Sequence, residues 1–260
     1  MDETVGEIAA RWSLTLGDRY AGPHASQVWR ARSPEHGDVV LKVGPRDFEA
    51  EHEAAGLRHW DGAGVVRVLR DEADDLSIAL LLERCEPGTP LKTRPDEEQD
   101  EVVASLLRRL WRTPPADGGP FRSLAAMCAR WADEASRREQ HLDPALHRDG
   151  LDLFCSLPLT APRDVLLCTD LHAANVVAAE REPWLVIDPK PFVGDPHYDA
   201  LQHMLNCDER LQTKPLDLVA RMAELLDLDR HRLRLWLFAR CVQDSAGWPM
   251  LRDVARAVAP

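Results

Sequence analysis

One segment, residues 166–199, constrains the fold of this chain more than any other. Within it, two short apolar runs are joined by the polar turn 180–183, and this pattern predicts a β-hairpin. Asp170 and Asn175 precede the hairpin, and Asp188 directly follows its second apolar run. Because the two open ends of a hairpin lie side by side, we expect Asn175 and Asp188 to lie close together.

These three side chains are of the kinds that phosphoryl transfer needs. The reaction requires a carboxylate that positions the attacking hydroxyl group, and oxygen ligands for Mg²⁺. An Asp-x4-Asn loop followed by an aspartate at the end of a short strand has the spacing found in kinases. In that arrangement Asp170 is the base, and Asn175 and Asp188 hold the metal ion. The alternative is a structural hairpin in which Asp and Asn only form turns.

The first part of the chain offers a lysine and a glutamate for nucleotide binding. Lys42 lies in the β-rich run 39–43, in a chain whose lysines are far outnumbered by arginines. The run 48–60 is rich in Ala and Glu and predicts a helix. Glu49 and Glu53 lie four residues apart on one face of that helix. We expect Glu53 to form an ion pair with Lys42.

A short loop, 21–26, lies between two apolar runs and is expected to contact phosphates through its backbone N–H groups. We place Ser26 among the nucleotide-binding residues for this reason. Gly22 is the single glycine of the loop, so this segment identifies no function when it is considered alone.

The coarse pattern of the chain changes near residue 84, from short β-like runs with one helix to mostly helical segments. A proline-rich and glycine-rich loop at 113–120 interrupts the second part, because no helix persists through such a sequence. Strands are predicted at 12–16, 27–31, 39–43, 65–69 and 77–83. Further helices are predicted at 96–111, 124–140, 144–155, 198–206, 216–226 and 231–244.

Taken together, these segments resemble the aminoglycoside phosphotransferases, which are small-molecule kinases built on the protein-kinase fold. Two further segments, 80–84 and 193–199, carry the resemblance, which extends from about residue 17 to about residue 248. The segments 181–184 and 188–190 are most similar to the branch of streptomycin 6-kinases and hydroxyurea kinases.

The resemblance implies an α+β, bilobal, protein-kinase-like fold. A small β-rich N-terminal lobe with one helix, residues 1–84, would bind the nucleotide. A larger and mainly helical C-terminal lobe, residues 85–260, would carry the catalytic loop and bind the acceptor. One departure concerns Cys168 and Thr169, which stand where the family usually has His-Gly before the catalytic aspartate.

The resemblance also implies roles for individual residues. Lys42 would contact the α- and β-phosphates of ATP, and backbone groups of Glu83, Arg84 and Cys85 would form the hinge that binds adenine. Asp199 would brace the catalytic loop by accepting backbone hydrogen bonds; the alternative is a carboxylate favoured by a helix N-terminus. The carboxylates proposed to bind the acceptor are Asp195 and those around Asp133 and Glu134.

Composition limits the partners of the chain. Its 260 residues carry a formal net charge of −12, which disfavours nucleic acid and suits a cationic acceptor. No apolar run approaches the roughly 18 residues of a membrane span, and no signal peptide is recognisable. The six cysteines contain no Cys-x-x-Cys pair and are expected to be reduced, buried thiols. We therefore expect a cytoplasmic protein, monomeric or weakly dimeric, with no membrane partner.

The resulting hypothesis is a kinase that uses ATP and Mg²⁺ to phosphorylate a hydroxyl group of a streptomycin-like aminoglycoside, which would give antibiotic resistance. A kinase of hydroxyurea or of another small metabolite is the alternative within the same class. Two other classes remain. One is a metal-dependent phosphohydrolase, which would use Asp170 and His172 as metal ligands, with Asp188, Asp195 and His197 as further ligands. The other is a nucleotide-binding protein without catalysis.

Overall fold

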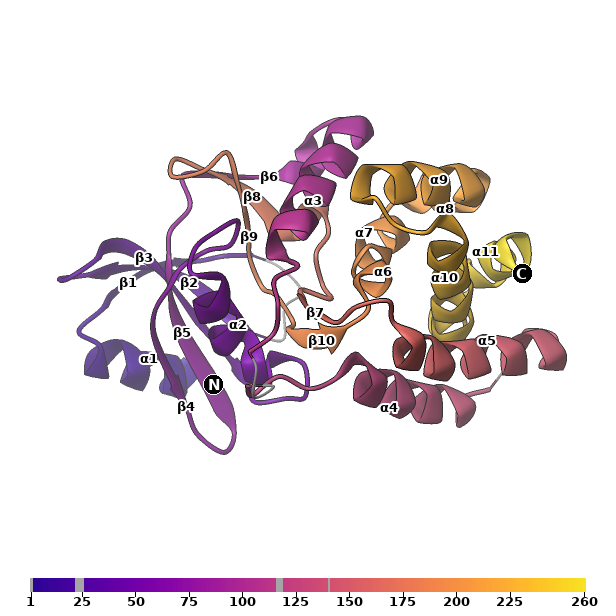
Figure 1. The fold of residues 1–260 in the computed structure, drawn as a ribbon. Helices are drawn as coiled ribbons and strands as arrows, with labels where there is room; N and C mark the ends of the chain where they lie inside the picture. Colours follow the sequence, from indigo (N-terminus) through magenta and orange to yellow (C-terminus); the bar gives the residue numbers. More distant parts are fainter. Residues whose placement is uncertain (1, 22–25, 116–118, 140) are drawn as a thin grey trace. The chain divides into compact units, whose positions relative to one another are not determined.

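The computed structural model describes residues 2–21, 26–115, 119–139 and 141–260 (Figure 1). The chain forms two compact units. The first contains Met1–Pro90 and Val177–Lys190, and the second contains Leu91–Val176 and Pro191–Pro260. This division differs from the boundary predicted near residue 84 because the hairpin 177–190 belongs to the first unit, although it lies far along the sequence.

The first unit is built on a five-stranded antiparallel sheet with the order β1-β2-β3-β5-β4. Lys42 lies in the middle of β3, opposite Val28 of β2 and Leu80 of β5. The predicted strands are present, with shifted ends at β1 and β4. Their bounds are β1 Thr15–Arg19, β2 Gln27–Ser33, β3 Gly37–Pro45, β4 Val68–Ala73 and β5 Ser77–Glu83.

Helix α1, Asp2–Arg11, covers one face of this sheet (Figure 1). Its residues Val5 and Ile8, and Trp12 just after it, pack against Leu41 of β3. Burial of such side chains contributes about 1.5–3 kcal/mol each. The sequence pattern predicts no helix here and a strand that starts at Trp12 instead. That prediction is wrong, because Trp12 continues the turn of α1 by donating its backbone N–H to Ile8.

Alternate residues of β3 face opposite sides of the sheet, so Lys42 points away from the face that holds Leu41. The predicted helix at 48–60 consists of a 3₁₀ turn, η1 Ala50–His52, followed by α2, Glu53–Trp60. Leu57 and Trp60 are buried. Helix α2 ends at Asp61, whose backbone is left-handed with φ 48°.

The hairpin that the sequence predicts is present in the first unit. Strands β8, Val176–Ala179, and β9, Trp184–Val186, join β6, Pro87–Pro90, in a three-stranded sheet with the order β6-β8-β9. Val65 forms a parallel bridge with Val186. This pairing with β6 extends the first unit to Pro90.

The second unit is mainly helical, with one two-stranded antiparallel sheet formed by β7, Val165–Leu167, and β10, Phe192–Gly194. Helix α10 packs against α4, α5, α9 and α11 (Figure 1). At one contact the side chain of Val242 of α10 packs directly on Gly150 of α5, where an added Cβ would lie 2.5 Å from it. The helices are α3 Asp96–Leu110, α4 Leu124–Ser136, α5 Pro144–Ser156, α6 Pro196–Asp199, α7 Leu201–Leu205, α8 Asp208–Thr213, α9 Pro215–Leu226, α10 Arg230–Asp244 and α11 Leu251–Val258.

Capping residues explain why three of these helices begin close to their predicted starts. Ser123, Asp143 and Asp229 each accept a backbone N–H of the first helical turn with a side-chain oxygen, at the starts of α4, α5 and α10. Such caps contribute about 1 kcal/mol each. The predicted helix at 198–206 is divided into α6 and α7, and α8 and α11 are not predicted. Over the described part of the chain, the helices are too short or too polar to cross a membrane.

Candidate active site

Lys42 forms ion pairs with two carboxylates of the first unit. Its Nζ lies 2.6 Å from Glu53 Oε2 and 2.5 Å from Asp188 Oδ1. The predicted Lys42–Glu53 pair is therefore present, formed between β3 and the first residue of α2. The side chain of Glu53 is only 2% exposed. Burial raises the pKa of Glu53, and the charge of Lys42 opposes that shift.

Asp188, which follows β9, accepts a second ammonium group. Lys190 Nζ also lies 2.5 Å from Asp188 Oδ1, so Lys42 and Lys190 share one carboxylate oxygen. Burial acts to raise the pKa of Asp188, but the charges of the two lysines outweigh it and hold the pKa below its ordinary value. The backbone of Asp188 is left-handed, with φ 55°. No role is predicted for Lys190 from the sequence.

The loop that carries Asp170 lies in the second unit, between β7 and the 3₁₀ turn η4, Ala173–Asn175. The Nδ2 of Asn175 donates to the backbone oxygen of Asp170 at 3.0 Å and to its carboxylate Oδ2 at 3.3 Å. The first bond holds the backbone of Asp170, and the second holds its carboxylate. Both bonds use the amide nitrogen of Asn175, so the amide oxygen is the atom that could bind a metal ion. The expected proximity of Asn175 to Asp188 stays a prediction.

Asp199, at the end of α6, holds the start of this loop. Its carboxylate accepts the backbone N–H of Cys168 at 3.1 Å, the backbone N–H of Thr169 at 2.6 Å and the indole N–H of Trp111 at 2.9 Å. Burial raises the pKa of Asp199 to about 6, against these hydrogen bonds. Two of these three hydrogen bonds come from the start of the loop that carries Asp170, which is the arrangement expected of a brace. The alternative, a carboxylate favoured by the helix N-terminus, does not explain these two bonds.

Thr169 occupies the position where the family usually has glycine, and its backbone adopts a left-handed conformation with φ 49°. That region favours glycine and is costly for a β-branched residue. The bond from Thr169 N–H to Asp199 holds the loop in this conformation. The loop therefore keeps a glycine-like backbone without the glycine.

The predicted hinge lies at the end of β5 in the first unit. Glu83 accepts two hydrogen bonds from Arg181, at 2.6 and 3.2 Å, and one from the backbone N–H of Arg67 at 2.8 Å. Arg181 also donates to the backbone oxygens of Gly62 and Val65, at 2.6 and 3.0 Å. Arg181, which the sequence analysis does not single out, thus ties the turn of the hairpin to the hinge.

A surface hollow lies beside the hinge within the first unit. Cys85 is partly buried in its lining, and burial raises the pKa of this thiol to about 11, so the thiol is protonated at neutral pH. The lining consists of Glu83, Arg84, Cys85, Glu86, Ala179, Glu180, Arg181 and Leu185.

The phosphate-binding loop expected at 21–26 can be described only in part, because residues 22–25 lie outside the described residues. Ser26 is described. Its side chain lies over Gly44 of β3, where an added Cβ would come within 2.1 Å of Ser26 Oγ. Gly44, which is two residues after Lys42, therefore permits the close approach of Ser26.

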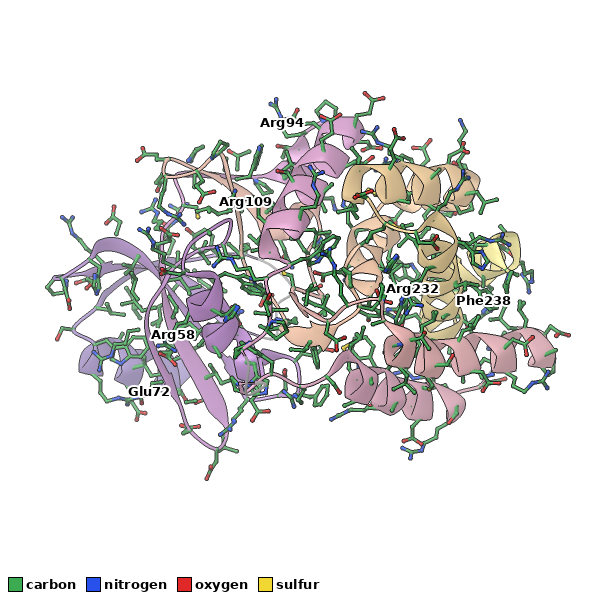
Figure 2. All side chains as sticks on the ribbon, viewed as in Figure 1. Arg58, Glu72, Arg94, Arg109, Arg232 and Phe238 are labelled. Atoms are coloured by element: carbon green, nitrogen blue, oxygen red, sulfur yellow. The ribbon has the colours of Figure 1, made fainter. Side chains whose placement is uncertain are left out.

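The structure gives no support to the acceptor-binding role predicted for Asp195, because its side chain is buried and both carboxylate oxygens are bonded within the second unit. Oδ1 lies 2.6 Å from His197 Nδ1, and Oδ2 accepts hydrogen bonds from Arg232 and Trp236, each at 2.7 Å. Figure 2 labels Arg232 on α10. Asp195 also caps α6 by accepting the backbone N–H of His197. It is a structural residue.

The other expected acceptor carboxylates lie on the exposed surface of α4. Asp133 pairs with Arg137 at 2.6 Å, and Glu134 pairs with Arg130 at 3.0 Å. Exposed pairs at this helical spacing contribute only about 0.3–0.5 kcal/mol. Their arrangement is typical of a solvated helix face and gives no sign of an acceptor site.

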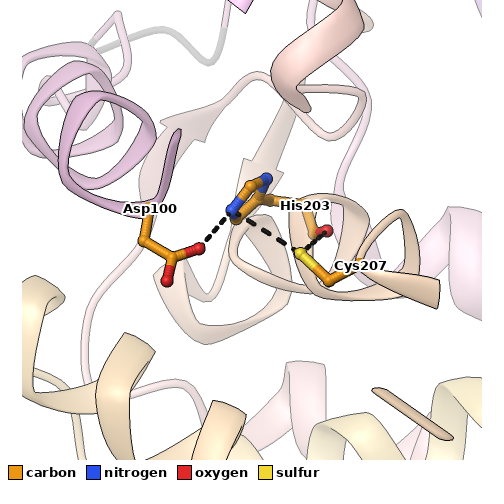
Figure 3. A group of neighbouring side chains, drawn as sticks. All are labelled: Asp100, His203 and Cys207. Carbon is orange, nitrogen blue, oxygen red and sulfur yellow. Dashed lines mark hydrogen bonds and ion pairs between the residues drawn. The ribbon is translucent and has the colours of Figure 1, made fainter. Parts of the chain in front are cut away.

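A cluster of potential metal ligands, Asp100, His203 and Cys207, lies in the second unit (Figure 3). His203 Nε2 lies 2.8 Å from Asp100 Oδ1 and 3.8 Å from Cys207 Sγ. Asp100 also accepts hydrogen bonds from Arg210, at 2.7 and 2.9 Å, and from Arg221, at 2.6 Å. Because these donors engage both oxygens of Asp100, the cluster is an ion network that joins α3, α7, α8 and α9.

The network keeps its charges at neutral pH. Burial acts to lower the pKa of His203, but the hydrogen bonds with Asp100 and Cys207 outweigh it and raise the pKa to about 9. Burial acts to raise the pKa of Asp100, and its bonds with His203, Arg210 and Arg221 hold it well below its ordinary value. Both partners are therefore ionised.

The two units together define the class of the chain: a sheet with a lysine–glutamate pair, and a helical unit with an Asp-x4-Asn loop. The same fold is found in a solved structure of a choline/ethanolamine kinase family protein from Mesorhizobium loti. The two are 15% identical with a TM-score of 0.62, and the match covers 99% of this chain and 91% of the other. The chain thus has the protein-kinase-like fold of small-molecule kinases, and the α/β sandwich required by the phosphohydrolase alternative is not the fold found.

The family follows from the sequence. The model of the aminoglycoside/hydroxyurea antibiotic resistance kinases matches residues 11–252, and the chain belongs to this family. It is 35% identical to a streptomycin 6-kinase of Streptomyces glaucescens, over 93% of this chain and 80% of the relative. It is also 35% identical to a hydroxyurea phosphotransferase of Kitasatospora aureofaciens, over 92% of this chain and 71% of the relative. The chain is therefore an ATP-dependent phosphotransferase with a hydroxyl group as acceptor.

Proposed function

We propose that this protein transfers the γ-phosphoryl group of ATP, in the presence of Mg²⁺, to a hydroxyl group of a streptomycin-like aminoglycoside and thereby inactivates the antibiotic. The observation that carries the proposal is the pairing of Lys42 with both Glu53 and Asp188. Two carboxylates hold the ammonium group of Lys42 in one place. A lysine fixed in this way is ready to contact nucleotide phosphates, which supports a role for the pair in ATP binding.

The carboxylate and amide oxygens available here suit Mg²⁺, which prefers oxygen ligands. We assign the carboxylate of Asp188 and the amide oxygen of Asn175 to the metal ion, which would neutralise charge on the phosphates and orient them. Asn175 also positions the neighbouring carboxylate of Asp170, through its bonds to that residue. In this assignment one short loop supplies both a metal ligand and the base.

Asp170 is the proposed catalytic base. Its carboxylate would accept the proton of the acceptor hydroxyl group and align the hydroxyl oxygen with the γ-phosphorus. Asp199 supports this role indirectly, because it holds the loop that carries Asp170. The backbone of Glu83, Arg84 and Cys85 is the proposed adenine-binding hinge, and Ser26 a proposed phosphate contact.

The acceptor is proposed to be cationic. The net charge of −12 favours the approach of a polyamine-like or guanidine-bearing molecule, and a streptomycin 6-kinase is among the relatives. A neutral acceptor is the second candidate, because the hydroxyurea phosphotransferase is equally similar to this chain at 35% identity. The identities alone do not separate these two acceptors.

An ATP-consumption screen over aminoglycosides, tuberactinomycin-type peptides and hydroxyurea tests the proposal, with mass spectrometry to detect the phosphorylated product. We expect consumption of ATP with streptomycin that requires Mg²⁺ and is lost in Asp170→Asn. A phosphorylated product with hydroxyurea alone would favour the second candidate. ATP turnover that no acceptor stimulates, with no phosphorylated product, would refute the proposed function.

A further inference from the structure

Lys190 and Lys42 donate to the same oxygen of Asp188, each at 2.5 Å. All three side chains belong to the first unit and are largely shielded from water, with 17% of Lys190, 11% of Lys42 and 33% of Asp188 exposed. Two ammonium groups on one carboxylate oxygen are held close to each other, although their charges repel. A further anion beside the two ammonium groups would relieve this repulsion.

The four charges of the cluster balance in the nucleotide-free protein. Lys42 and Lys190 carry two positive charges, and Glu53 and Asp188 carry two negative ones. In the proposed function, Mg²⁺ would bind Asp188 and compete with both ammonium groups for that carboxylate. Lys42 would keep Glu53 as a partner. The pairing of Lys190 with Asp188 would weaken, and the triphosphate that accompanies the metal ion would offer several anionic oxygens to its ammonium group.

The use of lysine in this chain points the same way. Only four of its 32 basic residues are lysines, Lys42, Lys92, Lys190 and Lys214, and the others are arginines. Two of these four lysines meet at Asp188. An ammonium group is a compact charge on a flexible stem, which can change partners within a small site, whereas a guanidinium group favours one fixed, planar pairing. A lysine therefore suits a group that must move from a carboxylate to a phosphate.

We propose that Lys190 is a second phosphate-binding lysine beside Lys42. In the nucleotide-free protein its ammonium group neutralises Asp188. With MgATP bound, Asp188 would hold the metal ion, and the ammonium group of Lys190 would pair with oxygens of the terminal phosphates. This inference rests on the proposed function, since it requires that the site around Lys42 binds ATP.

The competing account is that Lys190 only neutralises a partly buried carboxylate. The two accounts differ in what happens as phosphates are added to the nucleotide. A phosphate-binding lysine strengthens the binding of ATP and ADP and leaves adenosine unaffected. If the lysine is purely structural, its removal weakens the binding of all these ligands alike, through the stability of the site, or changes the binding of none of them.

Calorimetric titration of purified protein with adenosine, AMP, ADP and ATP, each with Mg²⁺ and with a chelator, separates these accounts. Lys190→Met removes the charge and keeps most of the side chain, and Lys190→Arg keeps the charge. Lys214→Met, at an exposed position of the second unit, is the matched control. A thermal melt of each variant checks that it is folded. If Lys190→Met does not fold, Lys190→Gln serves as a second neutral variant.

We expect the neutral variants to bind ATP about 10- to 100-fold more weakly than the parent, the scale of a lost hydrogen bond to a charged group. The loss should be smaller for ADP and absent for adenosine, and Lys190→Arg should recover part of the ATP affinity. Equal ATP affinity in the parent and in a folded neutral variant, or an equal loss for adenosine and ATP, would overturn the role of Lys190 alone. If the parent itself bound no ATP, both the proposed function and this inference would be refuted.

Discussion

Asp199 accepts the backbone N–H of Thr169 at 2.6 Å, and Thr169 has a left-handed backbone with φ 49°. This bond holds the chain in a conformation that a β-branched residue otherwise avoids. Because Asp170 is the next residue, the direction of the proposed base depends on this bond. The same carboxylate accepts hydrogen bonds from Cys168 and Trp111, so one side chain organises the whole start of the loop.

Asp199→Ala should destabilise the protein strongly. The substitution leaves the N–H groups of Cys168, Thr169 and Trp111 without their acceptor, and each buried donor left unsatisfied costs roughly 1–3 kcal/mol. We expect the free energy of unfolding, measured in urea, to fall by about 3 kcal/mol or more. Asp253→Ala, at a carboxylate that is 88% exposed, is the control and should change it by less than about 0.5 kcal/mol. Similar values for the two variants would show that Asp199 is not a brace.

Asp170→Asn tests the proposed base. The substitution keeps the shape of the side chain but removes its ability to take a proton, so kcat should fall by roughly 10²–10⁴-fold. Binding of ATP should change little, because the nucleotide is proposed to be held by other residues. The control is Asp164→Asn, at an exposed position that precedes β7. Steady-state kinetics that gave a near-normal kcat for Asp170→Asn would contradict the assignment.

The sequence predicts the parts of this protein whose residues lie close together along the chain. The hairpin between Asn175 and Asp188 follows from apolar runs that flank a polar turn. Three helices begin close to their predicted starts, where the structure shows capping residues. The pair of Lys42 and Glu53 is also predicted, because a lysine in a strand followed by a glutamate-rich helix is a local pattern. The kinase class and the family, which rest on these segments, are confirmed.

Contacts between distant residues account for what the sequence analysis misses. Asp195 lies in a segment where an acceptor-binding carboxylate is expected. It is instead bonded to Arg232 and Trp236, which lie 37 and 41 residues further along the chain. Arg181 reaches Glu83 across 98 residues. The residues next to Asp195 and Arg181 in the sequence do not indicate these distant partners. Lys190 is the exception, because the rarity of lysine in this chain is a signal that the sequence itself contains.

The ion pair of His203 and Asp100 makes stability depend on pH. The pKa of His203 is raised to about 9 in the folded protein, above its ordinary value of 6.5. The protonated imidazole therefore contributes stability in full below about pH 6.5, and this contribution is lost as the pH rises through about 9. A pKa difference of this size corresponds to roughly 3 kcal/mol in the free energy of unfolding.

Urea unfolding of the parent and of His203→Gln between pH 6 and 8.5 measures this contribution. The advantage of the parent over the variant should be largest at pH 6 and should shrink as the pH rises. The difference between the two proteins isolates His203 from thiols that titrate in the same range. A difference that stayed constant across this range would rule out the charged His203–Asp100 pair.

The response of the acceptor to salt distinguishes a cationic acceptor from a neutral one. An exposed ion pair contributes only about 0–1 kcal/mol, so a polycationic acceptor needs several such contacts, and all of them are screened by salt. The KM for a streptomycin-like acceptor should therefore rise steeply with ionic strength, while the KM for ATP should rise less. A flat acceptor KM from low to high salt would count against a cationic acceptor and leave the kinase class standing.

The most direct test of the central claim follows the phosphoryl group itself. The protein is incubated with streptomycin, Mg²⁺ and ATP whose terminal phosphoryl oxygens carry ¹⁸O, and the products are resolved by mass spectrometry. Transfer to a hydroxyl group predicts a phosphorylated acceptor that retains the labelled oxygens, formed in step with ADP and absent with Asp170→Asn. Labelled inorganic phosphate with unmodified acceptor, both for streptomycin and for hydroxyurea, would contradict the account.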